Sequence, residues 1–144
     1  MNRFPIIRVV SKFMIPYILL FGLYVQFHGD FGPGGGFQAG VIFASAIILY
    51  GLVYGLSAAQ EVAPSWLIEK LIAVGLVLYA GTGFVCMALG GKFLDYDTLE
   101  HDLWSELPHG QHLGIFAVEL GVGITVTSVM VMIYYAFAGR DRVV

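Results

Sequence analysis

Three long stretches that are almost free of charge decide what this chain can fold into. Residues 37–56 and 71–89 contain no charged side chain, and residues 113–137 contain only Glu119. A helix needs about 20 mostly apolar residues to cross the hydrocarbon core of a bilayer. The three stretches therefore predict three membrane-spanning helices.

A shorter apolar stretch, residues 13–27, precedes them and includes Pro16. Extended back to residue 9, it is long enough to span the membrane if Lys12 reaches the headgroups. A secretory signal peptide is the alternative, but no small-residue cleavage site follows the stretch. The chain is therefore predicted to be one all-α transmembrane domain, residues 1–144. Its four spanning helices, about 9–27, 37–56, 71–89 and 113–137, are expected to form two hairpins.

Composition excludes several classes of protein. Only 12% of the residues are charged and 58% are hydrophobic, whereas a soluble domain carries about 25% charged residues. A soluble enzyme and a disordered chain are excluded on this ground, and the net charge of −3 argues against nucleic-acid binding. The lone Cys86 provides neither a disulfide nor an iron–sulfur ligand set. We expect no cofactor and no catalytic activity.

The basic residues predict the orientation. Six of the seven lie at the ends of the predicted helices that face the same side as both termini, and Lys92 is alone on the other side. Because cytoplasmic loops carry an excess of Lys and Arg, both termini are predicted to be cytoplasmic. The six residues are Arg3, Arg8, Lys12, Lys70, Arg140 and Arg142.

The segment between the first two helices is unlike an ordinary loop. Pro33 is followed by Gly34, Gly35 and Gly36, which allow positive φ and close backbone approach. No Lys-Ser or Lys-Thr pair follows, so this is not a phosphate-binding loop, and the potassium-filter motif is absent. Two interpretations remain open at this point. The segment is buried against a partner or a polar passage, or it is a flexible external turn.

The residues from His28 to Gly40 resemble the signature of the B subunit of Mrp-type multisubunit sodium/proton antiporters, the MnhB family. The core of the match is Pro-Gly-Gly-Gly-Phe-Gln-Ala-Gly at 33–40. A basic N-terminus, four predicted helices and Glu-Leu-Gly-Val-Gly at 119–123 extend it over nearly the whole chain.

The resemblance implies a non-catalytic subunit of a hetero-oligomeric complex in the plasma membrane. That family exchanges cytoplasmic sodium for external protons, and larger subunits carry the proton-pumping helices. Pro33 and Phe37 are the motif positions that the resemblance implies for transport or assembly. Related segments occur in the membrane arms of respiratory-type hydrogenases, so a hydrogenase subunit is an alternative, as is a structural scaffold subunit.

Glu119 is the main candidate for the ion path. A carboxylate inside an apolar span is costly and commonly marks an ion or proton pathway, although a hydrogen-bonded glutamate at a helix interface is the alternative. His28 and Asp30, beside the glycine segment, and Lys92, after the third helix, are further candidates, or else ordinary interfacial residues. His101, His109 and His112 with nearby acids do not have the spacing of a metal site, and no metal site is predicted.

Small residues recur at helical spacing in the second and fourth helices, where they permit close helix contact. Such stripes predict packing against other subunits, and tight packing within the monomer is the alternative. The positions expected to matter for subunit packing are Gly34, Gly35, Gly36, Gly40 and Gly121.

Overall fold

A computed structural model describes residues 5–29, 34–96 and 110–140 of the chain. The regular elements of the described part are all helices: α1 (Pro5–His28), α2 (Gly36–Tyr54), α3 (Leu56–Val62), α4 (Ser65–Ala88) and α6 (Gly110–Gly139). All but the short α3 are long and apolar enough to cross a membrane. The prediction of an all-α protein with four spanning helices is confirmed.

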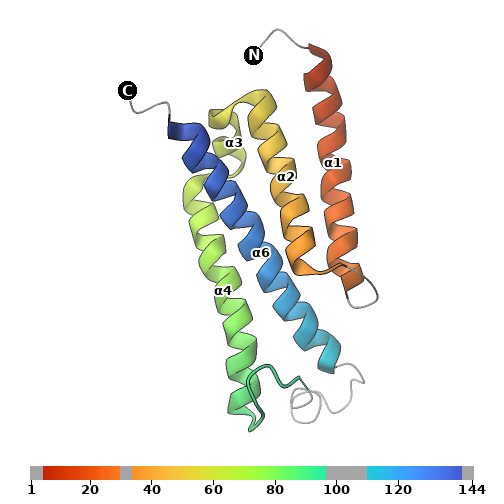
Figure 1. Ribbon diagram of the computed structural model, residues 1–144, viewed down its shortest axis with the longest axis vertical. Helices are drawn as coiled ribbons and strands as arrows, with labels where there is room; N and C mark the ends of the chain where they lie inside the picture. The colour runs from red at the N-terminus through yellow and green to blue at the C-terminus, as the bar shows by residue number, and fades with distance from the viewer. Residues whose placement is uncertain (1–4, 30–33, 97–109, 141–144) are drawn as a thin grey trace.

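The four long helices lie side by side in the order α1, α2, α6, α4 (Figure 1). The two predicted hairpins are α1 with α2 and α4 with α6, and the hairpins meet where α2 packs on α6. Helices α1 and α4 are therefore at the two edges, and α6 is an inner helix. This order brings the start of α2 against the side of α6.

All four spanning helices begin earlier than predicted, two of them by four and six residues. Helix α1 begins at Pro5 rather than at residue 9, since proline is well tolerated in the first turn, where its missing N–H is not needed. Helix α4 begins at Ser65 rather than at residue 71, after Pro64, whose carbonyl accepts hydrogen bonds from Leu67 and Ile68. The predicted span began after Lys70 because it followed the charge-free run, whereas the helix also includes Glu69 and Lys70.

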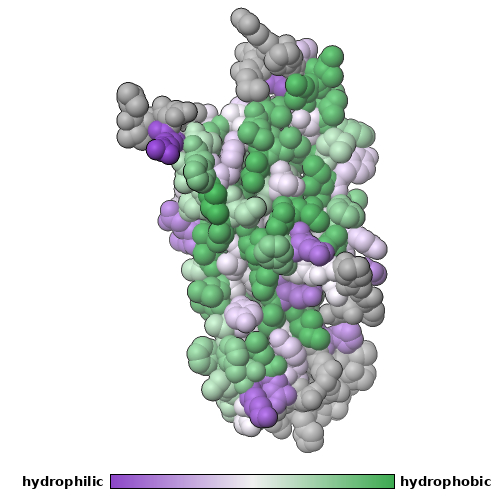
Figure 2. Space-filling view, viewed as in Figure 1, coloured by the Kyte–Doolittle hydropathy of each residue, from purple (hydrophilic) through white to green (hydrophobic). Residues whose placement is uncertain are grey.

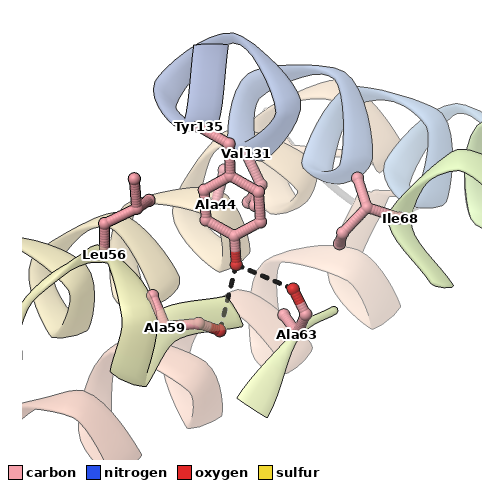
Figure 3. Packing of buried hydrophobic residues seen from close by; sticks show 7 residues of the cluster. All are labelled: Ala44, Leu56, Ala59, Ala63, Ile68, Val131 and Tyr135. Carbon is pink, nitrogen blue, oxygen red and sulfur yellow. Dashed lines mark hydrogen bonds between the residues drawn. The ribbon is translucent and has the colours of Figure 1, made fainter. Parts of the chain in front are cut away.

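The short helix α3, which connects α2 to α4, was not predicted. It packs against α6. The hydroxyl of Tyr135 on α6 lies 3.0 Å from the carbonyl oxygen of Ala59 and 2.8 Å from that of Ala63 (Figure 3). Tyr135 is buried, with Leu56 and Val131 packed in the same cluster. The single hydroxyl hydrogen is shared between these two carbonyls at the end of α3, and the Ala59 carbonyl also accepts the Ala63 N–H at 2.8 Å.

The outer surface is strongly apolar. Large hydrophobic side chains cover the face shown in Figure 2, and polar ones are few and scattered. On α1 alone, Ile6, Val9, Phe13 and Leu20 are each more than half exposed. Such a surface needs lipid or other apolar protein around it.

Candidate ion-path site

Glu119 lies on α6, against the described residues of the glycine-rich segment. It is nine residues from Gly110, or roughly 14 Å along the helix axis, and it is half-buried. A Cβ atom placed on Gly29 would lie 2.5 Å from Oε2 and 2.7 Å from Oε1 of Glu119. A Cβ atom on Gly35 would lie 2.8 Å from Oε1. The carboxylate therefore lies between the end of α1 and the start of α2.

Gly36 brings the backbones of α2 and α6 together at the same place. A Cβ atom on Gly36 would overlap the backbone carbonyl oxygen of Glu119, so no other residue fits here without movement of a helix. Gly29, Gly35 and Gly36 form what we call the glycine cradle of Glu119. A side chain at any of the three positions would collide with Glu119.

The local backbone explains why glycine is required at Gly35. Its φ of 112° and ψ of −177° are rarely adopted by residues with a side chain. This conformation turns the chain into α2, and the Gly35 carbonyl accepts the Ala39 N–H at 3.0 Å. The Glu119 carboxylate therefore lies beside the first turn of α2. The first N–H groups of a helix have no partner within the helix, and the helix dipole gives this end a partial positive charge.

Beyond the cradle, α2 and α6 stay in close contact along their small residues. A Cβ atom on Gly40 would lie 2.8 Å from the Gly123 carbonyl oxygen. The Thr127 hydroxyl is 2.7 Å from that oxygen and 3.1 Å from the Gly40 carbonyl oxygen. This line of contacts continues the site from Glu119 toward the middle of α6.

The five glycines expected at subunit interfaces have neighbours within this chain. Gly35, Gly36 and Gly40 face α6, and Gly34 lies near the Val25 carbonyl oxygen, 3.2 Å from a Cβ placed on it. Gly121 faces α4, where a Cβ atom would lie 2.9 Å from the Gly75 carbonyl oxygen. These contacts account for the small residues without another subunit, so a role between subunits stays a prediction.

The other candidates are more exposed. Phe37 is 64% exposed on the first turn of α2, and His28 is exposed at the end of α1, with its ring stacked 5.2 Å from that of Tyr24. Lys92 is exposed after α4, and its backbone N–H donates to the Asp95 carboxylate at 3.4 Å. The structure therefore joins Glu119 to the glycines of the motif. The roles of His28, Phe37 and Lys92 stay predictions.

Several predicted residues lie outside the described part of the chain. These are Asp30, Pro33, His101 and His109. Within residues 5–29, 34–96 and 110–140, no group of three or more His, Cys, Asp or Glu side chains could hold a metal ion.

Two residues of this region were missed by the sequence analysis. Gly29 lies as close to the carboxylate as the predicted glycines do, but a glycine after a helix is too common to stand out. Gln26 on α1 is 4% exposed, and its Oε1 would lie 2.8 Å from a Cβ atom on Gly123. An uncharged polar residue in an apolar helix was the available signal for Gln26.

Comparison with known proteins identifies the family. Residues 6–132 match the family described as a domain related to the MnhB subunit of Na+/H+ antiporter. Proteins of Staphylococcus haemolyticus, Staphylococcus epidermidis and Staphylococcus aureus, each named "Putative antiporter subunit mnhB2", are 37%, 35% and 33% identical to it. Each match covers 93% of this chain and 94% of the relative. The resemblance seen in residues 28–40 is confirmed, and the chain belongs to the MnhB family of Na+/H+ antiporter subunits, multi-pass membrane proteins that are transporter components rather than enzymes.

Proposed function

We propose that this subunit is needed to assemble a multisubunit sodium/proton antiporter and lines part of its ion path through Glu119. The observation that carries the proposal is the contact between the Glu119 carboxylate and the glycine cradle. The most distinctive segment of the sequence thus meets the single charge of the apolar stretch in α6. The proposed location is the cell membrane, with both termini in the cytoplasm.

The chemistry of the cradle supports a carboxylate that exchanges a proton or a cation. The lack of a side chain at Gly29 and Gly35 lets both carboxylate oxygens lie against the backbone there, and a carboxylate is an oxygen ligand suited to a hard cation such as sodium. A side chain at Gly29 or Gly35 would displace the carboxylate from this position.

The contact between α2 and α6 supports the assembly role. Gly36, Gly40 and Gly123 allow the two helices to approach at backbone distance, and Thr127 adds a hydrogen bond to the Gly40 carbonyl. In lipid, such close packing and hydrogen bonding replace the hydrophobic effect as the force between helices. A change in this contact would alter the surface that the subunit offers to its partners.

The test is sodium-dependent proton movement in inverted vesicles that contain the complete complex. Glu119→Gln keeps the size and the hydrogen-bonding ability of the side chain but cannot release a proton or carry charge. We expect this variant to assemble and to lose at least about tenfold in exchange rate, which corresponds to roughly 1.4 kcal/mol. Glu61→Gln, at an exposed carboxylate of α3, is the matched control and should exchange normally.

A second substitution separates the two proposed roles. Glu119→Ala removes the charge and the packing together, so it should reduce both assembly and exchange. If Glu119→Gln assembles and exchanges at the normal rate across the working pH range, the ion-path role is wrong. The assembly role would then be judged from Glu119→Ala alone.

A further inference from the structure

A pocket between α1 and α2 lies near the end of the bundle where α1 begins and α2 ends (Figure 1). It has a volume of about 260 Å³ and is lined by Lys12, Ile15, Pro16, Tyr50 and Tyr54. We call it the Lys12 pocket. Lys12 is exposed and both tyrosines are partly exposed, so a ligand outside the subunit can reach the polar part of the wall.

Contacts between α1 and α2 hold the wall of the Lys12 pocket in place. The Tyr54 hydroxyl donates a hydrogen bond to the Arg8 carbonyl oxygen at 2.9 Å. The Arg8 guanidinium lies over the Tyr54 ring, with Cζ 5.4 Å from the ring centroid. The rings of Tyr50 and Tyr54 stack with their centroids 4.7 Å apart. The two helices are therefore joined here by the protein's own contacts.

The charge around the pocket favours an anion. Arg8 and Lys12 are four residues apart on α1 and lie on the same side of the helix. Neither α1 nor α2 contains an Asp or Glu. Two like charges at this spacing repel each other, and an anion beside Lys12 offsets that repulsion.

The pocket lies at the level of the lipid headgroups. Helix α2 has 19 residues and is about 28 Å long, close to the thickness of the hydrocarbon core, about 30 Å. Its last residue, Tyr54, is therefore near the hydrocarbon boundary, and so is Arg8, which Tyr54 contacts. Lys12 is about 6 Å further along α1, a depth from which a lysine side chain reaches the headgroups.

The apolar part of the wall favours a phospholipid over a free anion. Ile15 and Pro16 form one side of the pocket. Pro16 and Leu20, four and eight residues after Lys12, are exposed and continue the same side of α1 into the hydrocarbon. The acyl chains of a phospholipid bound at Lys12 would cover this side, whereas an inorganic phosphate would leave it uncovered.

We propose that the Lys12 pocket binds the headgroup phosphate of an anionic phospholipid, whose acyl chains lie along α1. The Lys12 ammonium pairs with the phosphate, and Arg8 adds attraction at longer range. Basic pockets between spanning helices bind anionic headgroups by the same electrostatics. The proposal rests on the membrane-spanning helices of the chain and does not depend on the role proposed for Glu119.

The first test measures which lipid contacts the pocket in the complete antiporter complex. The purified complex is placed in phosphatidylcholine vesicles that contain a small amount of phosphatidylglycerol with a photoreactive diazirine close to its headgroup. Mass spectrometry then maps the labelled residues after irradiation. Labelling at residues 12–16 and 50–54 should exceed that by the matching photoreactive phosphatidylcholine on the order of fivefold. Equal labelling by the two lipids, or no labelling at these residues, would overturn the proposal.

Inorganic phosphate distinguishes a lipid site from a site for a free anion. Phosphate and sodium chloride are added to separate samples at the same ionic strength. Both should lower the labelling by phosphatidylglycerol to the same extent, because both screen charge equally. A larger loss with phosphate would assign the pocket to a free anion and overturn the proposal.

The second test removes the charge of Lys12. Lys12→Gln should lower labelling of the pocket by phosphatidylglycerol on the order of fivefold, whereas Lys12→Arg should preserve it. Lys70→Gln is the matched control. Lys70 is an exposed lysine near the same end of the bundle, outside the pocket, with Nζ 5.0 Å from the centroid of the Trp66 ring. This control should leave labelling of the pocket unchanged.

Normal labelling of Lys12→Gln, or an equal loss in Lys70→Gln, would show that Lys12 does not hold the lipid. If Lys12→Gln lowers the amount of complex in the membrane, the comparison of the two photoreactive lipids on the unchanged chain decides the question. Loss of exchange in Glu119→Gln has no bearing on any of these results, so the two proposals can fail separately.

Discussion

Gly36 at the start of α2 lies in backbone contact with Glu119 of α6, so closely that a methyl group on Gly36 would overlap the Glu119 carbonyl oxygen. The residues are 83 positions apart in the chain. Their contact fixes how the first hairpin sits on the second, and it brings Gly29 and Gly35 to the Glu119 carboxylate.

The first prediction concerns this contact. Gly36→Ala should destabilise the subunit by about 1–3 kcal/mol, because the added methyl group must push two backbones apart. The measurement is the thermal midpoint and the yield of the purified complex. Gly81→Ala is the matched control: Gly81 lies within α4 with nothing within 4 Å of a Cβ atom. It should leave stability unchanged or slightly improved.

The second prediction separates the carboxylate from the backbone contact. Gly29→Ala places its methyl group against the flexible end of Glu119 rather than against a backbone. The complex should therefore assemble, while the displaced carboxylate lowers the sodium-dependent exchange rate several-fold in vesicles. Exchange at the normal rate by this variant would show that the carboxylate position is unimportant.

The third prediction concerns the attachment of α3. Tyr135→Phe removes the hydroxyl that lies near the Ala59 and Ala63 carbonyls. The Ala59 carbonyl keeps its bond from the Ala63 N–H, but the Ala63 carbonyl loses the hydroxyl donor, at a cost of about 1–3 kcal/mol, and the thermal midpoint should fall accordingly. Tyr17→Phe, at a tyrosine that is 55% exposed on α1, should not shift the midpoint. Equal midpoints for the two variants would contradict the role of Tyr135.

The fourth prediction is the orientation in the membrane. In a Cys86→Ser background, a cysteine at Ser57 on α3 should react with an impermeant thiol reagent only after the cytoplasmic side is opened. A cysteine at Glu106, between α4 and α6, should react in intact cells. This outcome follows from the excess of Lys and Arg on the side of the termini. The opposite labelling pattern would reverse the topology.

The sequence by itself determined that this chain is an all-α membrane protein with four spanning helices. It did so because a charge-free run long enough to cross a bilayer has few other stable conformations. The glycine segment was also sufficient to indicate the family. Both signals depend on neighbours in sequence, which are visible without any fold.

The tertiary structure decided which residues meet. The order α1, α2, α6, α4, the glycine cradle around Glu119 and the burial of Gln26 all depend on contacts between helices distant in sequence. Apolar residues on every side of a membrane helix give little indication of which face a neighbour covers, because lipid and protein interiors are similarly apolar. The small residues predicted close contacts, and only the packed helices showed that many of those contacts lie within the chain.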